Sequence, residues 1–158
     1  MTTRLKLALV LATAAFAAQA GSAAGIDAKA WDGTWHLNAA ESKWGTRTKE
    51  QSETRTYGYA GGKLTMKSSA KDGAGKETDF TYSAALDGKW YPMTGNPNAD
   101  SIAVTAGGPR EVRSTSRMKG KVTVHSTATV SADGKHLTLK RVYVAQNGSP
   151  NETLVFDR

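Results

Sequence analysis

Trp31-Asp-Gly-Thr-Trp-His-Leu37 is the stretch of the chain that decides the fold. Its Gly33-x-Trp35 follows an apolar N-terminal segment and precedes a long series of residues with strand-like patterning. Small all-β domains that enclose a ligand commonly begin their first strand in this way. We therefore predict an exported β-barrel with an enclosed cavity, and the motif does not specify what the cavity holds.

Beyond residue 50 the sequence alternates polar and apolar residues in short runs, which is typical of antiparallel strands. In one run, Phe80 and Tyr82 alternate with Asp79 and Thr81. Glycine-containing pairs that suit tight hairpins separate the runs at intervals of about ten residues. The pattern predicts about ten strands, at 31–37, 51–59, 63–70, 76–86, 88–92, 101–106, 110–118, 121–130, 135–145 and 151–157.

These strands predict an all-β fold, a single antiparallel meander β-barrel of about ten strands (8–10), because closure removes the exposed edges of a long sheet. At most one short helix is expected, after the first strand between Asn38 and Lys49, with Asn38 as N-cap and Glu41 three residues on. Small residues at inward positions favour a cavity; they are Ser68, Ala70, Ala84, Ser114, Ser116, Ser126 and Ala128. A flattened, fully packed barrel remains the alternative.

The N-terminal residues have the features of an export signal. Arg4 and Lys6 precede an apolar run, and Ala18-Gln-Ala20 is a small-x-small cleavage site. We expect a cleaved signal peptide at 1–20, a linker at 21–30 and a lipocalin-like barrel domain at 31–158. The chain has no cysteine, so the mature domain must be stabilised by its core. The expected location is the periplasm or the outside of the cell.

The charge balance is moderately basic. The full chain carries a formal charge of +7, and losing Arg4 and Lys6 with the signal lowers that by two. A basic outer face could contact an anionic polymer or a protein partner, although the charge also serves solubility. The outward candidates are Lys63, Lys67, Arg113, Arg117 and Lys121. Export argues against a nucleic-acid partner, and lysine and arginine on outward faces argue against a membrane-spanning barrel.

The opening and the end of the domain resemble the calycin superfamily, particularly its lipocalin-like and fatty-acid-binding branch. The residues that carry the resemblance are Gly33-Thr-Trp-His-Leu37 and Thr153-Leu-Val-Phe-Asp-Arg158. The segments 87–92 and 95–100 are also similar to exported bacterial lipocalin-like proteins of unassigned function. Biotin-binding barrels share the Gly-Thr-Trp opening, so the motif alone does not separate these groups.

The resemblance implies a structural role for Gly33, Trp35 and Arg158. In calycins the tryptophan lies across the closed end of the barrel near a basic residue, which here could be Arg158 or Arg141. In fatty-acid carriers an Arg-x-Tyr of the last strand holds the ligand carboxylate. The matching positions here are Leu154 and Phe156, so the resemblance does not imply a fatty-acid ligand.

An Arg-x-Tyr does occur on two other predicted strands, as Arg55-Thr-Tyr57 and Arg141-Val-Tyr143. Strict alternation from the leucines of its strand turns Arg141 inward, whereas a bulge would turn it outward. Inward arginines would suit an acidic ligand head group. With the aromatic residues that could line a cavity, the candidate ligand-binding set is Arg55, Tyr57, Phe80, Tyr82, Trp90, Arg141, Tyr143 and Phe156.

Nothing in the sequence singles out a catalytic group. The three histidines, His36, His125 and His136, lack metal-ligand spacing, and neither a metal nor a cofactor is expected. The sequence favours a monomeric, non-enzymatic binding protein for a small hydrophobic or amphipathic molecule, an acidic one included. The alternatives are an envelope interaction module with a packed barrel and a basic outer face, and a barrel enzyme acting on a lipophilic substrate.

Overall fold

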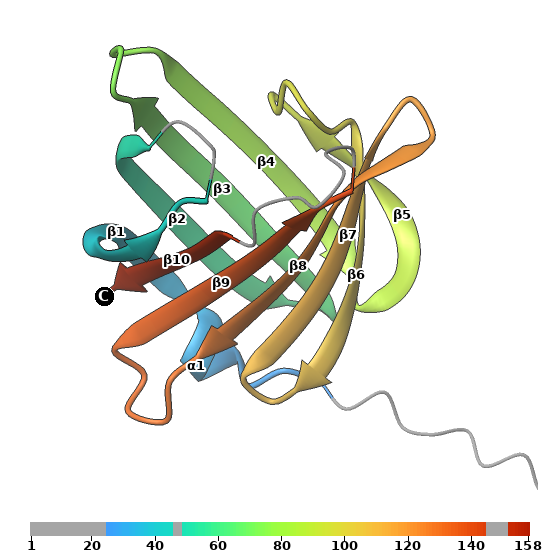
Figure 1. The fold of residues 1–158 in the computed structure, drawn as a ribbon. Helices are drawn as coiled ribbons and strands as arrows, with labels where there is room; N and C mark the ends of the chain where they lie inside the picture. Colours follow the sequence, from blue (N-terminus) through green and yellow to red (C-terminus); the bar gives the residue numbers. More distant parts are fainter. Residues whose placement is uncertain (1–24, 46–48, 145–151) are drawn as a thin grey trace, which may run out of the picture.

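A computed structural model describes residues 25–45, 49–144 and 152–158, which form a closed antiparallel β-barrel (Figure 1). The predicted single meander barrel is confirmed. The described residues contain one short helix and ten strands: α1 (Ala28–Trp31), β1 (Gly33–Lys43), β2 (Glu50–Ala60), β3 (Lys63–Asp72), β4 (Glu77–Ala85), β5 (Asp87–Thr94), β6 (Ser101–Gly108), β7 (Glu111–Met118), β8 (Lys121–Val130), β9 (His136–Tyr143) and β10 (Glu152–Asp157).

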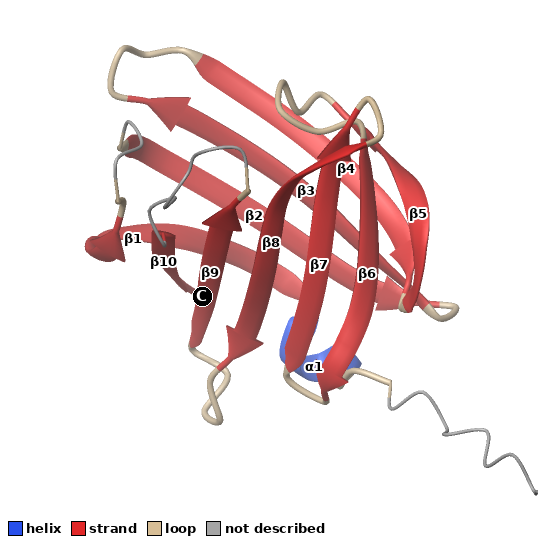
Figure 2. Cartoon of the chain, turned by 45° about the vertical axis from the view of Figure 1, so that its right-hand side comes forward, coloured by secondary structure: helices blue, strands red, loops and turns tan. Residues whose placement is uncertain are grey.

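The sheet is a meander in which each strand pairs with its neighbours in sequence, and β1 pairs with β10 to close it (Figure 2). Alternation decides what faces inward. In β3, Leu64 and Met66 are buried while Lys63, Thr65 and Lys67 are exposed. The tight β2–β3 hairpin turns through Gly61 and Gly62, whose φ angles of +58° and +73° are the values that glycine adopts without strain.

The helix expected between Asn38 and Lys49 is wrong within the described residues. Strand β1 continues to Lys43, and its pairing with β10 is irregular between Asn38 and Lys43. The Asn38 side chain accepts a hydrogen bond from the backbone N–H of Glu41 at 3.2 Å. The signal interpreted as a helix cap therefore forms a local turn within a bulged strand. Residues 46–48 lie outside the described part of the chain.

The single described helix precedes β1 and closes one end of the barrel (Figures 1 and 2). Trp31 is fully buried, and Ile26 and Ala30, which the sequence placed in a linker, also belong to the core. The backbone N–H of Asp27 and the indole N–H of Trp31 both donate to the carbonyl of Pro109, at 2.8 and 3.3 Å. The barrel domain therefore begins before residue 31, with α1 as its plug.

The predicted signal peptide at 1–20 lies outside the described residues, and so does Asn147-Gly148, one of the glycine-containing pairs expected to form hairpin turns. In the part of the chain that the structure does describe, no helix has the length and apolar character needed to cross a membrane.

Candidate functional site

The barrel contains a partly open cavity of about 500 Å³ that extends from Trp31, at the helix end, to the β5–β6 loop at Asn96–Asn98. The wall is partly apolar, formed by Tyr57, Met66, Tyr82, Met93, Ile102, Val112, Ala128 and Leu139. The small hydroxyls of Ser114, Ser116 and Ser126 also face this space. Because short side chains leave the centre unfilled, the fully packed alternative does not describe this barrel.

Arg55 is the central charged residue of the cavity wall, and its neighbours keep it in place. It is only 3% exposed, and its Nε donates to Glu53 at 2.6 Å. Its guanidinium lies 5.8 Å from the ring centre of Phe80 and 5.1 Å from that of Phe156. Burial would lower the pKa of Arg55, but Glu53 and Tyr57 raise it above its usual value, so the guanidinium stays charged.

Glu53 is the buried partner of Arg55. Its Oε1 also accepts a hydrogen bond from the Ser68 hydroxyl at 2.7 Å. Burial opposes ionisation of Glu53, but Arg55 and the hydrogen bonds from Glu50 and Ser68 outweigh it and lower its pKa to about 2. The pair therefore consists of a carboxylate and a guanidinium, both taken out of water, a costly arrangement that depends on these hydrogen bonds.

A second buried ion pair lies across β9 and β10. Arg141 Nη1 donates to Glu152 at 3.2 Å, and the Tyr143 hydroxyl donates to the same carboxylate oxygen at 2.7 Å. Glu152 is fully buried. Val142 and Val144 are exposed, so the β9 strand follows strict alternation with Arg141 and Tyr143 inside. The register left open by the sequence is thus the inward one.

Glu50 links the two pairs at the cavity wall. Burial and the neighbouring Glu53 raise the pKa of Glu50 to about 8, although Arg141 and Arg55 act in the opposite direction. Glu50 is therefore mostly protonated near neutral pH and can donate a hydrogen bond to Glu53. Arg55 lowers the pKa of Arg141 and Glu53 raises it, so the two ion pairs interact electrostatically. We call the whole group the polar cluster; its members are Glu50, Glu53, Arg55, Ser68, Arg141, Tyr143 and Glu152.

The structure sorts the predicted ligand-binding residues into two groups. Arg55, Tyr57, Phe80, Tyr82, Arg141 and Tyr143 all line the cavity. Trp90 and Phe156 do not. Phe156 is fully buried in the core beneath Arg55, and Trp90 is 38% exposed on the outer face with Arg117 over its ring at 4.0 Å. Buried Met93 and partly buried Tyr91 occupy the inward positions of β5, so alternation turns Trp90 outward.

At the helix end, Trp35 is fully buried and Arg158 stacks over its ring at 4.2 Å. The indole N–H of Trp35 donates to the Trp31 carbonyl at 3.4 Å. Of the two cationic partners considered for Trp35, Arg158 is the one in contact. Trp35 does not line the cavity, and its contacts with Trp31 and Arg158 help to close this end of the barrel.

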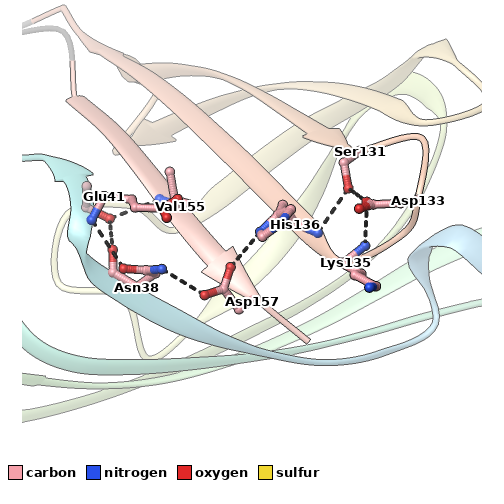
Figure 3. Close-up of polar contacts among 9 residues, drawn as sticks. Asn38, Glu41, Ser131, Asp133, Lys135, His136, Val155 and Asp157 are labelled. Atoms are coloured by element: carbon pink, nitrogen blue, oxygen red, sulfur yellow. Dashed lines mark hydrogen bonds and ion pairs between the residues drawn. The ribbon is translucent and has the colours of Figure 1, made fainter.

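The outer face carries a separate polar network on β1, β9 and β10 (Figure 3). Asp157 accepts a hydrogen bond from Asn38 at 2.8 Å and contacts Nδ1 of His136 at 2.7 Å. This hydrogen bond raises the pKa of His136. All three side chains lie outside the barrel, away from the cavity. No group of metal-ligating side chains is present among the described residues.

The sequence does not identify the carboxylates of the polar cluster, Glu50, Glu53 and Glu152, as site residues. Alternation puts Glu53 on the same face as Arg55 and Tyr57, but it does not show that Glu53 is the partner of Arg55. Glu152 could have been found by alternation, since it lies two residues before Leu154 and four before Phe156 on one face of β10. Glu50 has no comparable signal, because it lies at the first residue of β2.

Comparison of the chain with protein-family models, with curated proteins and with solved structures gives no match in any of the three.

Proposed function

We propose that this protein is an exported, non-enzymatic binding protein that holds one small amphipathic molecule inside its barrel. The observation that carries the proposal is the cavity itself, with apolar and aromatic side chains along one part of its wall and the polar cluster along another. A volume of about 500 Å³ lies within the range of small-molecule sites. The export part of the proposal rests on the N-terminal sequence alone.

The wall has two chemically distinct parts that would orient a guest. Met66, Ile102 and Leu139 offer an apolar surface for a hydrocarbon portion. On the inner face, three neighbouring strands place polar side chains next to one another. Arg141 of β9 is the cross-strand partner of Ser126 on β8, and Ser126 is the partner of Ser114 on β7. This row of hydrogen-bonding groups, together with Arg55, supplies the polar contacts that fix orientation in ligand pockets.

The arrangement favours binding over catalysis for a specific reason. The two arginines of the cavity wall are hydrogen-bonded to buried carboxylates, Arg55 to Glu53 at 2.6 Å and Arg141 to Glu152 at 3.2 Å. No histidine lines the cavity. Groups fixed in this way provide a rigid polar surface, which lowers the entropic cost of holding a guest.

A fluorescent probe tests the proposal. N-phenyl-1-naphthylamine is small, uncharged and apolar, and its emission rises when it leaves water. We expect saturable binding with one probe per chain. Ser116→Leu fills the cavity and should abolish that binding, whereas Thr115→Leu, one residue along on the outer face, should leave it unchanged.

Thermal unfolding of each variant shows whether it is folded, and Ala128→Leu replaces Ser116→Leu if the latter does not fold. Absence of saturable binding to the wild-type chain would reject the proposal. So would equal binding by the inward and outward leucine variants, because the probe would then occupy another surface.

One observation favours a second candidate function, contact with an anionic polymer. A second hollow of about 810 Å³ runs across β5–β10, with Arg113, His125 and Lys140 on its outer side. Inward residues such as Ser114 and Ser126 also contribute to its wall. Retention on a polyglutamate column at low salt tests it. Arg113→Gln with Lys140→Gln should reduce retention, while the equal charge loss of Lys63→Gln with Lys67→Gln on β3 should not.

A further inference from the structure

The two arginines that face the cavity already have carboxylate partners. Glu53 lies 2.6 Å from Arg55, with both side chains less than 5% exposed. Glu152 lies 3.2 Å from Arg141 and is fully buried. An arginine that binds an anionic ligand is expected to be exposed to water while the site is empty, because burying an unpaired charge is costly. These two are neutralised by the protein itself.

The formal charge of the polar cluster therefore sums to zero near neutral pH. The two guanidinium groups balance the carboxylates of Glu53 and Glu152. Glu50 adds no charge while it carries its proton, which burial favours. A guest with a full negative charge would have to leave water and compete with a buried carboxylate for its arginine, and this is unfavourable because the displaced carboxylate would stay buried without its cation.

One buried nitrogen of the cluster, a hydrogen-bond donor, is nevertheless unused among the described residues. Nη2 of Arg55 is buried and has no hydrogen-bond partner among the described residues, although Nε and Nη1 of the same guanidinium donate to Glu53 and Tyr57. Arg55 lines the cavity. A buried donor without an acceptor is costly, and an oxygen atom of a guest would remove that cost.

We infer that the guest carries an uncharged head group whose acceptor oxygen receives a hydrogen bond from Nη2 of Arg55. Amides, alcohols and esters with a hydrocarbon portion belong to this class. The inference rests on the proposed function, and it replaces the acidic head group suggested by the sequence. The zero net charge of the polar cluster favours an uncharged head group, and Nη2 of Arg55 determines where the oxygen of that head group binds.

Three probes with the same chain length and different head groups test the inference at pH 7: decanamide, decanoate and decylammonium. Each is used to displace N-phenyl-1-naphthylamine from the wild-type chain. We expect decanamide to bind at least about tenfold more tightly than either charged probe. Tightest binding by decanoate or decylammonium, or equal binding by all three, would overturn the inference and leave the proposed function standing.

A charge variant separates the electrostatic cause from shape. Glu152→Gln keeps an oxygen beside Arg141 and Tyr143 but gives the cluster one net positive charge, so decanoate should become the preferred probe. The double variant Glu50→Gln, Glu53→Gln is a second way to give the cluster one net positive charge. Both residues are replaced because Glu50 could ionise if Glu53 alone were replaced.

Glu111→Gln is the matched control, since Glu111 pairs with Arg113 on the outer face. It changes the net charge of the chain equally and should keep the wild-type order of probes. An unchanged order in both cavity variants would overturn the inference. If N-phenyl-1-naphthylamine itself fails to bind the wild-type chain, the proposed function fails as well, so the two failures are distinguishable.

Discussion

The guanidinium of Arg158 lies 4.2 Å from the ring centre of Trp35, and its Nη2 donates to the carbonyls of Ala30 and Asp32 at 3.0 and 2.9 Å. The last residue of the chain therefore joins the first strand to the helix that closes the barrel. Both carbonyls belong to the segment around the end of α1, so one side chain holds the plug in place. This makes Arg158 a structural contact of the closed end, separate from the polar cluster.

Arg158→Ala should lower the free energy of unfolding by about 2 kcal/mol, because it removes a cation–π contact and two charge-assisted hydrogen bonds. Urea unfolding measures the change. Arg113→Ala is the control, since it breaks an exposed ion pair that is worth less than about 1 kcal/mol. Equal losses in the two variants would contradict the role given to Arg158.

Gly33→Ala should also destabilise the closed end, by about 1–2 kcal/mol. Gly33 has a φ of +137°, and a Cβ there would lie 3.3 Å from Nη2 of Arg158. Gly108→Ala is the comparison, because a Cβ at Gly108 meets nothing within 4 Å. The prediction fails if urea unfolding gives the same stability for both variants.

The buried pair of Arg55 and Glu53 should show strong energetic coupling. Arg55→Met alone should cost about 3–5 kcal/mol because it leaves a buried carboxylate without its cation. The double variant Arg55→Met, Glu53→Met should cost clearly less than the two single variants added together. A double-mutant cycle by urea unfolding measures the coupling, and the exposed pair Glu111–Arg113 should give less than about 1 kcal/mol in the same cycle.

The raised pKa of Glu50 predicts a pH dependence of stability. In the folded protein Glu50 keeps its proton up to about pH 8, whereas its pKa in the unfolded chain is near the ordinary 4.5. The folded state thus holds more protons between these values, and the stability that Glu50 contributes is lost as the pH rises through this window, by up to about 1.4 kcal/mol per unit.

The measurement is the difference in unfolding free energy between the wild-type chain and Glu50→Gln from pH 5 to pH 8. That difference should fall steadily as the pH rises. Glu53 does not interfere, because its pKa is lowered to about 2 and the stability it contributes is lost only on acidification below about pH 4.5. A difference that stays constant across the window would contradict the assignment.

On the outer face, the hydrogen bond that His136 donates to the Asp157 carboxylate raises the pKa of His136 above its usual value (Figure 3). Asp157→Asn should bring that pKa back down, which an NMR titration of the imidazole protons can follow. Asn38→Ala keeps the carboxylate and should change the His136 titration much less. Equal effects of the two substitutions would show that the hydrogen bond is not the cause.

Much of the barrel could be predicted from the sequence because its strands follow simple alternation. The bounds predicted for the strands of the hairpin at Gly61-Gly62 and of β7 and β8 lie within two residues of those observed. Strict alternation from the leucines of β9 gives the inward register of Arg141 that the structure shows, but the sequence alone did not exclude a bulge that would turn it outward. The error at Asn38 arose because an asparagine that bonds the backbone three residues on serves helix caps and strand bulges alike.

The candidate site was predictable only in part, for two physical reasons. The pairing of β5 with β6 is irregular between Asp87 and Trp90, and sequence alone does not show which face a residue beside such an irregularity takes. The carboxylates were missed because an isolated glutamate in a strand is usually solvated. Glu53 pairs with Arg55 of its own strand and Glu152 with Arg141 of neighbouring β9, and both pairs are buried because these residues face the inside of the closed barrel.

A crystal structure of the protein with bound decanamide tests the central claim most directly. The account predicts one guest inside the barrel, with its chain against Met66 and Leu139 and its amide oxygen about 3 Å from Nη2 of Arg55. A guest bound only to the outer face, or a cavity that stays empty at saturating decanamide, would contradict it.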